Sequence, residues 1–202
     1  MTDKEKNNQN LNALEKRLLL EIARDAIYAA AAGNEPPSIQ LTDLPEILKR
    51  DGASFVTLTI SGKLRGCIGT LEATQPLALD VQEHAVAAAT QDFRFPPVSL
   101  NEVPLLDIEI SRLTPTKKLA YDDPADLAAK LQPGKDGVVI RDGFRRATFL
   151  PQVWEKLSKP EEFLGHLCMK MGAEPELWRK KDLEVFTYRV EEFKEEDFDG
   201  SR

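Results

Sequence analysis

The stretch that decides the fold is Leu64-Arg65-Gly66-Cys67-Ile68-Gly69-Thr70. It brings a cation, a thiol and two glycines together in a short segment with the character of a β-strand. Because successive side chains of a strand point to opposite faces, we expect Arg65 and Cys67 on one face, and Leu64 and Ile68 turned inward on the other. A guanidinium so close to a thiol favours the thiolate form, so a reactive cysteine is one interpretation of the stretch.

The residues before this stretch predict that it is the second arm of a β-hairpin. The segment 54–60 is rich in β-branched and aromatic residues, and Ser61-Gly62 after it is a two-residue turn signal. A second hairpin is predicted over 137–150, where Asp142-Gly143 is the strongest short hairpin signal in the chain. Since hairpins pair antiparallel strands, the sequence predicts a mostly antiparallel α+β fold.

Helices and further strands follow each predicted hairpin. Apolar residues at helical spacing and capping signals predict helices over 11–30, 75–91, 124–131 and 160–171. Alternating or β-rich segments predict strands over 105–113 and 183–190. The order hairpin, helix, strand therefore occurs twice. This order predicts either an internal duplication or a chance repetition of common elements, because residue identities do not visibly repeat.

Length, composition and charge limit the classes of protein that the chain can represent. It has 202 residues, of which 42% are hydrophobic and 30% charged, enough for one large or two small folded units. The net charge of −7 argues against a nucleic-acid partner, and no apolar run approaches the ~20 residues of a membrane span. We expect a disordered segment 1–10, an acidic tail 191–202, and a cytoplasmic protein with two reduced cysteines.

Three residues are candidates for catalysis: Cys67, His84 and His166. Cys67 is either a nucleophile or redox thiol, or a small buried side chain. His84 lies on the apolar stripe of its helix, as a structural histidine or a general base. His166 and Cys168 point about 200° apart on one helix, and the spacing of common zinc sites is absent. We therefore predict no metal and no cofactor.

The segment Asp92-Phe93-Arg94-Phe95-Pro96-Pro97 forms a second candidate site. Arg94 either presents an anion-binding guanidinium from a loop stiffened by proline, or satisfies carbonyl groups at the end of the preceding helix. Phosphate-binding loops of the types G-x-x-x-x-G-K-[ST] and G-x-G-x-x-G do not occur, and neither does a G-x-S-x-G elbow. Nucleotide binding therefore has no motif support.

Four segments give the chain a resemblance to a known family: LRGCIGT at 64–70, DFRFPPVSLNEVPLLDIEISRLTP at 92–115, ATFLPQVW at 147–154, and EEFLGHLCMKMG at 161–172. On these segments the chain resembles the AMMECR domain family over most of residues 50–190. The resemblance implies an α+β domain over 11–190 with a barrel-like, mostly antiparallel sheet and helices packed outside. It also implies two related β–β–α repeats, roughly 50–115 and 135–190, and two subdomains with a cleft near the first motif.

The resemblance can also be compared residue by residue with the motifs of the family. Phe93 departs from the family pattern, which usually has proline or a small residue there, so the rigidity of this turn is in question. Prokaryotic members occur beside, or fused to, a radical-SAM protein and a Memo-like protein, and no activity is firmly established for the family. The residues that match the two principal motifs are Arg65, Gly66, Cys67, Gly69, Thr70, Arg94, Phe95 and Pro96.

Two functions stay open at this point, and the first is favoured. The chain is a binding or accessory module that holds a small anionic ligand or a protein partner, possible partners being the radical-SAM and Memo-like proteins of a modification pathway. Alternatively, it is an enzyme in which Cys67 is the nucleophile or redox thiol, with Arg65 or Arg94 binding an anionic substrate. The candidate ligand-binding residues are Arg65, Gly66, Gly69, Thr70, Arg94 and Phe95.

Overall fold

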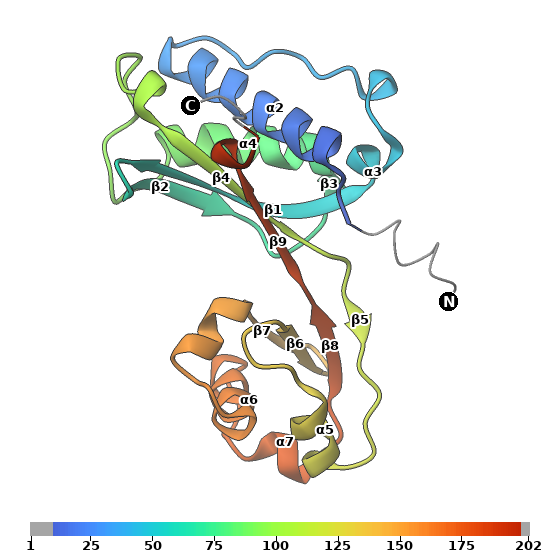
Figure 1. The fold of residues 1–202 in the computed structure, drawn as a ribbon. Helices are drawn as coiled ribbons and strands as arrows, with labels where there is room; N and C mark the ends of the chain where they lie inside the picture. Colours follow the sequence, from blue (N-terminus) through green and yellow to red (C-terminus); the bar gives the residue numbers. More distant parts are fainter. Residues whose placement is uncertain (1–9, 199–202) are drawn as a thin grey trace. The chain divides into compact units, whose positions relative to one another are not determined.

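A computed structural model describes residues 10–198, and the chain divides into two compact units (Figure 1). Unit 1 is Met1–Thr114 together with Glu191–Arg202, and unit 2 is Pro115–Val190. Nearly all of the segment 1–10, predicted to be disordered, lies outside the described residues. Within the described part of the chain, no helix has both the length and the apolar character needed to cross a membrane.

Unit 1 combines one sheet with two long helices. Its strands are β1 (Asp51–Ile60), β2 (Lys63–Gly69), β3 (Gln75–Pro76), β4 (Asp107–Leu113) and β9 (Val190–Lys194). Its helices are α2 (Ala13–Ala31), α3 (Glu46–Lys49) and α4 (Leu77–Thr90), with 3-10 turns at Leu41–Asp43, Val103–Leu105 and Glu195–Asp197. The strand order is β2-β1-β4-β9, with β3 paired to β1, so β2 lies at an edge of the sheet. The predicted hairpin, helices and strand of this region are confirmed.

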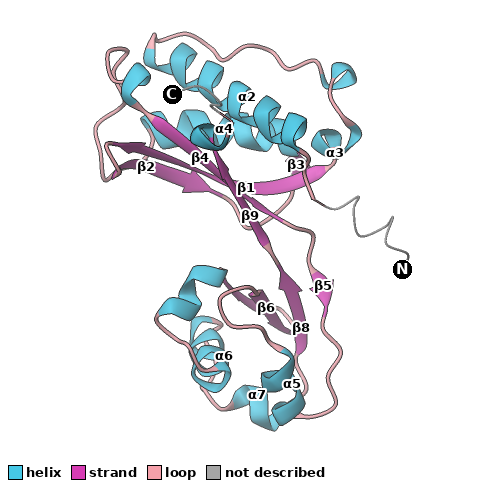
Figure 2. Ribbon diagram, in the orientation of Figure 1, coloured by secondary structure: helices cyan, strands magenta, loops and turns pink. Residues whose placement is uncertain are grey.

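Side chains of β1 and β4 that point to one face of the sheet contribute to the core of unit 1. Val56 and Leu58 are fully buried, as are Ile108 and Ile110 directly across from them on β4. Figure 2 shows α2 and α4 on the same side of this sheet. The alanines of α4 are short enough to let its backbone approach the strands, which matters for the site described below.

A bulge interrupts the pairing of β1 with β2 at Arg65. Leu58 lies opposite Gly66, but the next residue, Thr59, lies opposite Leu64, so Arg65 is skipped. Such a bulge reverses the alternation of side chains beyond it. The prediction that Leu64 turns inward is therefore wrong, since 41% of it is exposed. Ile68 packs against the core as predicted.

Unit 2 has its own sheet and its own core. Its strands are β5 (Lys117–Lys118), β6 (Gly137–Asp142), β7 (Arg145–Phe149) and β8 (Glu184–Tyr188), in the order β5-β8-β6-β7. Its helices are α5 (Pro124–Lys130), α6 (Pro160–Lys170) and α7 (Leu177–Lys180), with a 3-10 turn at Pro151–Glu155. Phe163 is fully buried and stacks on Trp154 with ring centroids 3.7 Å apart. The second predicted hairpin, its helix and the last strand are confirmed.

The two sheets share one plan but do not form a barrel. In each unit a hairpin is followed by a helix and a strand, and the first strand of the hairpin lies between its partner and that later strand. Each sheet ends at strands that pair on one side only, β2 and β9 in unit 1 and β5 and β7 in unit 2. The expectation of a barrel-like sheet is therefore wrong for the described residues, which form two open sheets.

The first residues of the predicted acidic tail, 191–202, belong to a β-strand. Residues 190–194 form β9, which extends the sheet of unit 1 beside β4. Glu191 pairs with the buried Arg112 at 2.5 Å, and Glu195 receives a hydrogen bond of 2.9 Å from Arg24 Nε. These arginines neutralise the acidic side chains, so the run of negative charge does not keep the segment away from the fold. Residues 199–202 lie outside the described part of the chain.

Candidate functional site

Asp92 and Arg94 together hold both main-chain groups of Cys67. The Cys67 N–H donates to Asp92 Oδ2 at 2.9 Å, and Arg94 Nη2 donates to the Cys67 carbonyl at 3.3 Å. Arg94 also donates to the Asp92 carboxylate through Nε at 2.8 Å and Nη2 at 2.6 Å. The Arg94 guanidinium and the Cys67 N–H lower the pKa of Asp92 well below its usual value. Asp92 and Arg94 thus make with Cys67 the hydrogen bonds that a further strand would make with the edge strand β2.

Arg65 fastens the following loop to the same strand. Its Nε donates to Glu102 Oε1 at 2.9 Å, its Nη1 to the Pro96 carbonyl at 2.8 Å and its Nη2 to the Pro97 carbonyl at 3.3 Å. Only 12% of the Arg65 side chain is exposed. Arg65, together with hydrogen bonds from Ser99, lowers the pKa of Glu102 to about 2. Arg65 therefore positions the loop and does not present a free cation.

We call the strand β2 with the loop 91–102 the β2 edge surface. On this surface Phe93 is 95% exposed, and the neighbouring Arg94 side chain is 44% exposed. The Arg94 guanidinium also lies over the ring of Phe95, 5.6 Å from its centroid. We call the hydrogen bonds of Asp92 and Arg94 to Cys67, and those of Arg65 to Glu102 and Pro96, the two clamps. Although Phe93 departs from the family pattern, these clamps fix the turn on either side of it.

Gly69 and Thr70 shape the end of β2 rather than a binding loop. A Cβ at Gly69 would overlap the Ser54 carbonyl and the Phe55 backbone, so glycine is needed for the close pairing of β2 with β1. The Thr70 N–H donates to the Ser54 carbonyl at 3.0 Å, and its hydroxyl accepts from the Glu72 N–H at 3.2 Å. Both residues therefore serve the local fold.

The Cys67 thiol lies on the sheet face away from α4. A Cβ at Gly66 would overlap the carbonyl oxygen of Ala88 in α4, so the adjacent residue points to the opposite face. There Thr57 Oγ1 lies 3.3 Å from Cys67 Sγ and donates to it. Thr57 lies directly across from both Cys67 and Glu109. Burial, and then the charge of Glu192, raise the pKa of Glu109.

The sequence analysis missed Thr57, Glu109 and Glu102 as neighbours of the motif. Their distance along the chain hides these relations. The strand register places Thr57 opposite Cys67 and Glu109, and the loop fold brings Glu102 to Arg65. Each is polar in a segment predicted as a strand or loop, which is too common a signal to single them out.

His84 belongs to a buried cluster on the other face of the sheet. Its Nδ1 lies 3.3 Å from Asp80 Oδ2, and the buried Ser54 hydroxyl donates to the same oxygen at 2.6 Å. Ser54 and Asp80 are almost fully buried, between β1 and α4. Since the Cys67 thiol faces away from α4, the structure does not bring Cys67 and His84 together.

The remaining predicted residues lie in unit 2. His166 is exposed on α6, and its Nδ1 lies 3.2 Å from the Glu162 carbonyl. Cys168 is buried in the core of unit 2, and burial raises the pKa of its thiol. Both cysteines are free thiols. Among residues 10–198, no group of three or more His, Cys, Asp or Glu side chains could hold a metal ion.

The Asp80–His84 pair predicts a pH-dependent stability. Hydrogen bonding and charge from Asp80 raise the pKa of His84 above its usual value, against the opposing effect of burial. This stabilisation is complete below the pKa of unfolded histidine and is lost as pH rises through the folded pKa. Urea denaturation across pH 5.5 to 8.5 should show that His84→Gln flattens this dependence. His166→Gln, the matched control, should keep it; an equal effect of both substitutions would contradict the assignment.

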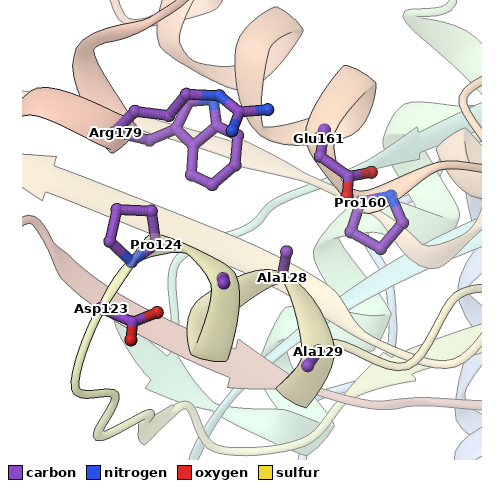
Figure 3. Close-up of a pocket in the computed structure, with 9 residues that line it drawn as sticks. Asp123, Pro124, Ala128, Ala129, Pro160, Glu161 and Arg179 are labelled. Atoms are coloured by element: carbon purple, nitrogen blue, oxygen red, sulfur yellow. The ribbon is translucent and has the colours of Figure 1, made fainter.

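Each unit also holds a cavity away from these residues. In unit 2, a cavity of about 700 Å³ lies between α5, the start of α6, and α7. Figure 3 shows Arg179, Pro124 and Pro160 among the residues that line it. Arg179 lies over the ring of Trp178, 4.2 Å from its centroid, and pairs with Glu176 at 3.0 Å. In unit 1, a cavity of about 970 Å³ lies between α2, Leu105 and Glu195. Neither cavity is lined by a residue predicted as catalytic or ligand-binding.

Comparison with known proteins identifies the family to which the chain belongs. The AMMECR1 family model matches residues 20–193, which include β2, the loop 91–102 and most of both units. The chain belongs to the AMMECR1 family. The predicted resemblance is therefore confirmed, and the two clamps on β2 lie within the AMMECR1 match.

Relatives of this AMMECR1 chain occur in archaea. It is 38% identical over 188 residues to a protein of Methanothermobacter thermautotrophicus, covering 90% of this chain and 95% of the relative. It is 37% identical over 180 residues to protein MJ0810 of Methanocaldococcus jannaschii, covering 86% of each. The crystal structure of the uncharacterised protein PH0010 from Pyrococcus horikoshii is similar, with a TM-score of 0.72, 33% identity, and coverage of 92% and 94% of the two chains.

Proposed function

We propose that this AMMECR1 chain is a partner-binding module that uses the β2 edge surface. The observation that carries the proposal is the double clamp, in which Asp92 with Arg94 and Arg65 with Glu102 fix the loop to β2. A surface held in one conformation loses little entropy on binding. Aromatic and arginine side chains dominate the binding energy of protein interfaces, and here Phe93 and Arg94 are exposed side by side.

The charges of this surface favour a protein partner over a small anionic ligand. The guanidinium of Arg65 is already neutralised by Glu102, and that of Arg94 by Asp92. A small anion would have to compete with these carboxylates, whereas a protein can use the exposed ring of Phe93 and leave both pairs intact. The radical-SAM and Memo-like proteins implied by the family resemblance are the first partners to test. The cleft expected beside the motif stays a prediction.

An enzyme that uses Cys67 is the second candidate. The hydrogen bond from Thr57 favours it, because a donor at 3.3 Å holds the Cys67 sulfur in one orientation. Against it, His84 lies on the opposite face of the sheet and His166 belongs to unit 2. Cys67 therefore has no histidine within reach among the residues of unit 1 that the structure describes.

Phe93→Ala is expected to weaken binding of a radical-SAM or Memo-like partner from the same organism at least tenfold. Removal of an exposed aromatic anchor costs this much when the ring inserts into the partner. Isothermal titration calorimetry with the purified proteins measures the effect. Phe144→Ala is the matched control, because Phe144 is also fully exposed but lies in unit 2.

Cys67→Ser separates the two candidate functions. A binding module should keep its affinity, whereas an enzyme with a Cys67 nucleophile would lose turnover. If wild-type chain binds neither protein, or if Phe93→Ala and Phe144→Ala weaken binding equally, the proposed surface is wrong.

We also infer that the two units derive from one duplicated β–β–α unit. The shared order of hairpin, helix and strand, with the same central strand, supports this inference. A structure-based alignment of β1–β2–α4–β4 with β6–β7–α6–β8 in related chains tests it, and sequence similarity no higher than between unrelated hairpins would speak against it.

A further inference from the structure

We propose that unit 1 binds a basic amphipathic helix of a partner protein in the cavity beside α2. This cavity of about 970 Å³ lies between α2, the 3-10 turn Val103–Leu105 and the segment 195–198, and we call it the α2 groove. It shares no lining residue with the β2 edge surface, so the inference goes beyond the proposed function.

The first observation is an exposed leucine that the fold holds in one place. Leu105 lines the α2 groove and is 61% exposed. Arg24 Nη1 donates to the Val103 carbonyl at 2.7 Å, and its Nη2 donates to the Leu106 carbonyl at 2.8 Å. Arg24 therefore fixes the main chain on both sides of Leu105. An apolar side chain that is already held in position costs little entropy when a partner covers it.

The second observation is that the apolar surface continues beyond Leu105. Four further apolar residues line the groove: Leu20, Pro104, Leu106 and Phe198. An apolar groove of this kind accommodates the apolar stripe of an amphipathic helix. A helix also satisfies its own main-chain groups, which suits a groove whose Val103 and Leu106 carbonyls already accept from Arg24.

The third observation is a set of acids that the fold leaves uncompensated. Glu21, Asp25 and Asp107 line the groove and are exposed, and within residues 10–198 their carboxylates form no ion pair or hydrogen bond. Glu21 and Asp25 lie one turn apart on α2, where like charges repel each other. Lysine or arginine side chains beside the apolar stripe of a bound helix would relieve this repulsion.

The two arginines of the groove do not cancel these acids. Arg24 is paired with Glu195, and Arg17 lies over the ring of Phe198, 5.9 Å from its centroid. The charge left for a partner is therefore negative. A basic helix can lay the aliphatic stems of its side chains on the apolar wall and bring their charged ends to the acids.

The charge of the whole unit favours the same partner. Residues 115–190 carry fourteen Lys and Arg against twelve Asp and Glu, whereas the whole chain carries 27 against 34. The negative excess thus belongs to unit 1, which attracts a basic segment and repels a second copy of itself. Charge complementarity therefore selects a basic partner for the α2 groove.

Fluorescence anisotropy with a fluorescein-labelled synthetic peptide tests the proposal on the full chain at 50 mM NaCl. The peptide has about four helical turns, with leucine at i, i+3, i+4 and i+7 and lysine elsewhere. We expect saturable binding that Leu105→Ala weakens at least fivefold and Asp25→Lys at least tenfold. At 500 mM NaCl the effect of Asp25→Lys should shrink, whereas that of Leu105→Ala should remain, because salt screens charge but not apolar contact.

Matched variants separate the α2 groove from the rest of unit 1. Leu64→Ala removes an exposed leucine on β2, and Glu35→Lys reverses an exposed acid that does not line the groove. Both should leave peptide binding unchanged. Equal losses on Leu64→Ala and Leu105→Ala, or on Glu35→Lys and Asp25→Lys, would overturn the proposed site.

Matched ligands test the chemistry of the partner. A scrambled peptide of the same composition, which has no apolar stripe, should bind at least tenfold more weakly. Equal binding of the scrambled peptide, or displacement of the amphipathic peptide by spermine at an equal concentration of positive charge, would assign the groove to polycations in general and overturn the proposal. Absence of binding to the amphipathic peptide at 50 mM NaCl would overturn it as well.

Discussion

Gly66→Ala is expected to destabilise the chain by about 3 kcal/mol. A Cβ at this position would overlap the carbonyl oxygen of Ala88, so β2 and α4 would have to separate. The Ala88 oxygen and the Gly66 Cα that would carry the new Cβ both belong to regular backbone, which moves less easily than the end of a side chain. Urea denaturation followed by far-UV circular dichroism measures the loss of stability.

Gly165→Ala is the matched control for Gly66→Ala. Gly165 lies within α6, and a Cβ there would meet Pro175 at 3.5 Å and 3.7 Å, which are ordinary contacts. Because alanine favours helix over glycine, the substitution should be neutral or stabilise by up to about 1 kcal/mol. If Gly66→Ala were as harmless as Gly165→Ala, the close approach of β2 and α4 would be wrong. The glycine of the motif would then have another role.

The elements of the fold could be predicted because their signals are local. A β-branched run followed by Ser61-Gly62 specifies the first hairpin, and Asp142-Gly143 specifies the second, through the turn conformations that these residues allow. The helices follow from apolar spacing and from capping signals such as Asp123 before Pro124, whose side chain accepts from the Asp126 N–H. In each case the residues that decide the structure lie within a few positions of one another.

Differences from the local signals arise where a distant partner decides the outcome. The bulge at Arg65 depends on the register between β1 and β2, which a one-residue shift changes without altering composition, and it turns Leu64 outward. The acidic segment after residue 190 becomes β9 because Arg112 and Arg24 offer it positive charge from far along the chain. Neither effect has a local signal.

The candidate site was predicted as a set of residues, and the structure changes their roles. Arg65 and Arg94 lie close to Cys67 as the motifs suggested, but each is paired with an acid that the spacing could not identify as its partner. Arg94 does satisfy a carbonyl group, as one interpretation held, although the carbonyl belongs to Cys67 and not to the helix end. Ion pairs between segments 37 residues apart, such as Arg65 with Glu102, become visible only in three dimensions.

Arg65→Ala is expected to destabilise the chain by about 2 kcal/mol and to loosen the loop 96–102. The substitution leaves the Glu102 carboxylate without its cation and the carbonyls of Pro96 and Pro97 without their donor. Since the Glu102 side chain is 31% exposed, water replaces part of the loss, which keeps the effect below that of a fully buried pair. Arg65→Lys keeps the charge but cannot reproduce the fork, so it should recover less than half of the stability.

The effect of Arg65 on the conformation of the loop can be tested separately from its effect on the stability of the chain. Arg179→Ala removes an exposed arginine that also pairs with a glutamate, and it should cost less than about 0.5 kcal/mol in urea denaturation. Hydrogen exchange should show faster exchange of the Glu102 N–H, which donates to the Ser99 carbonyl, in Arg65→Ala but not in Arg179→Ala. Because Arg65 acts through the loop, Arg65→Ala should weaken partner binding through Phe93. Unchanged exchange together with unchanged binding would show that the loop holds its conformation without Arg65 and would remove the basis for a preorganised surface.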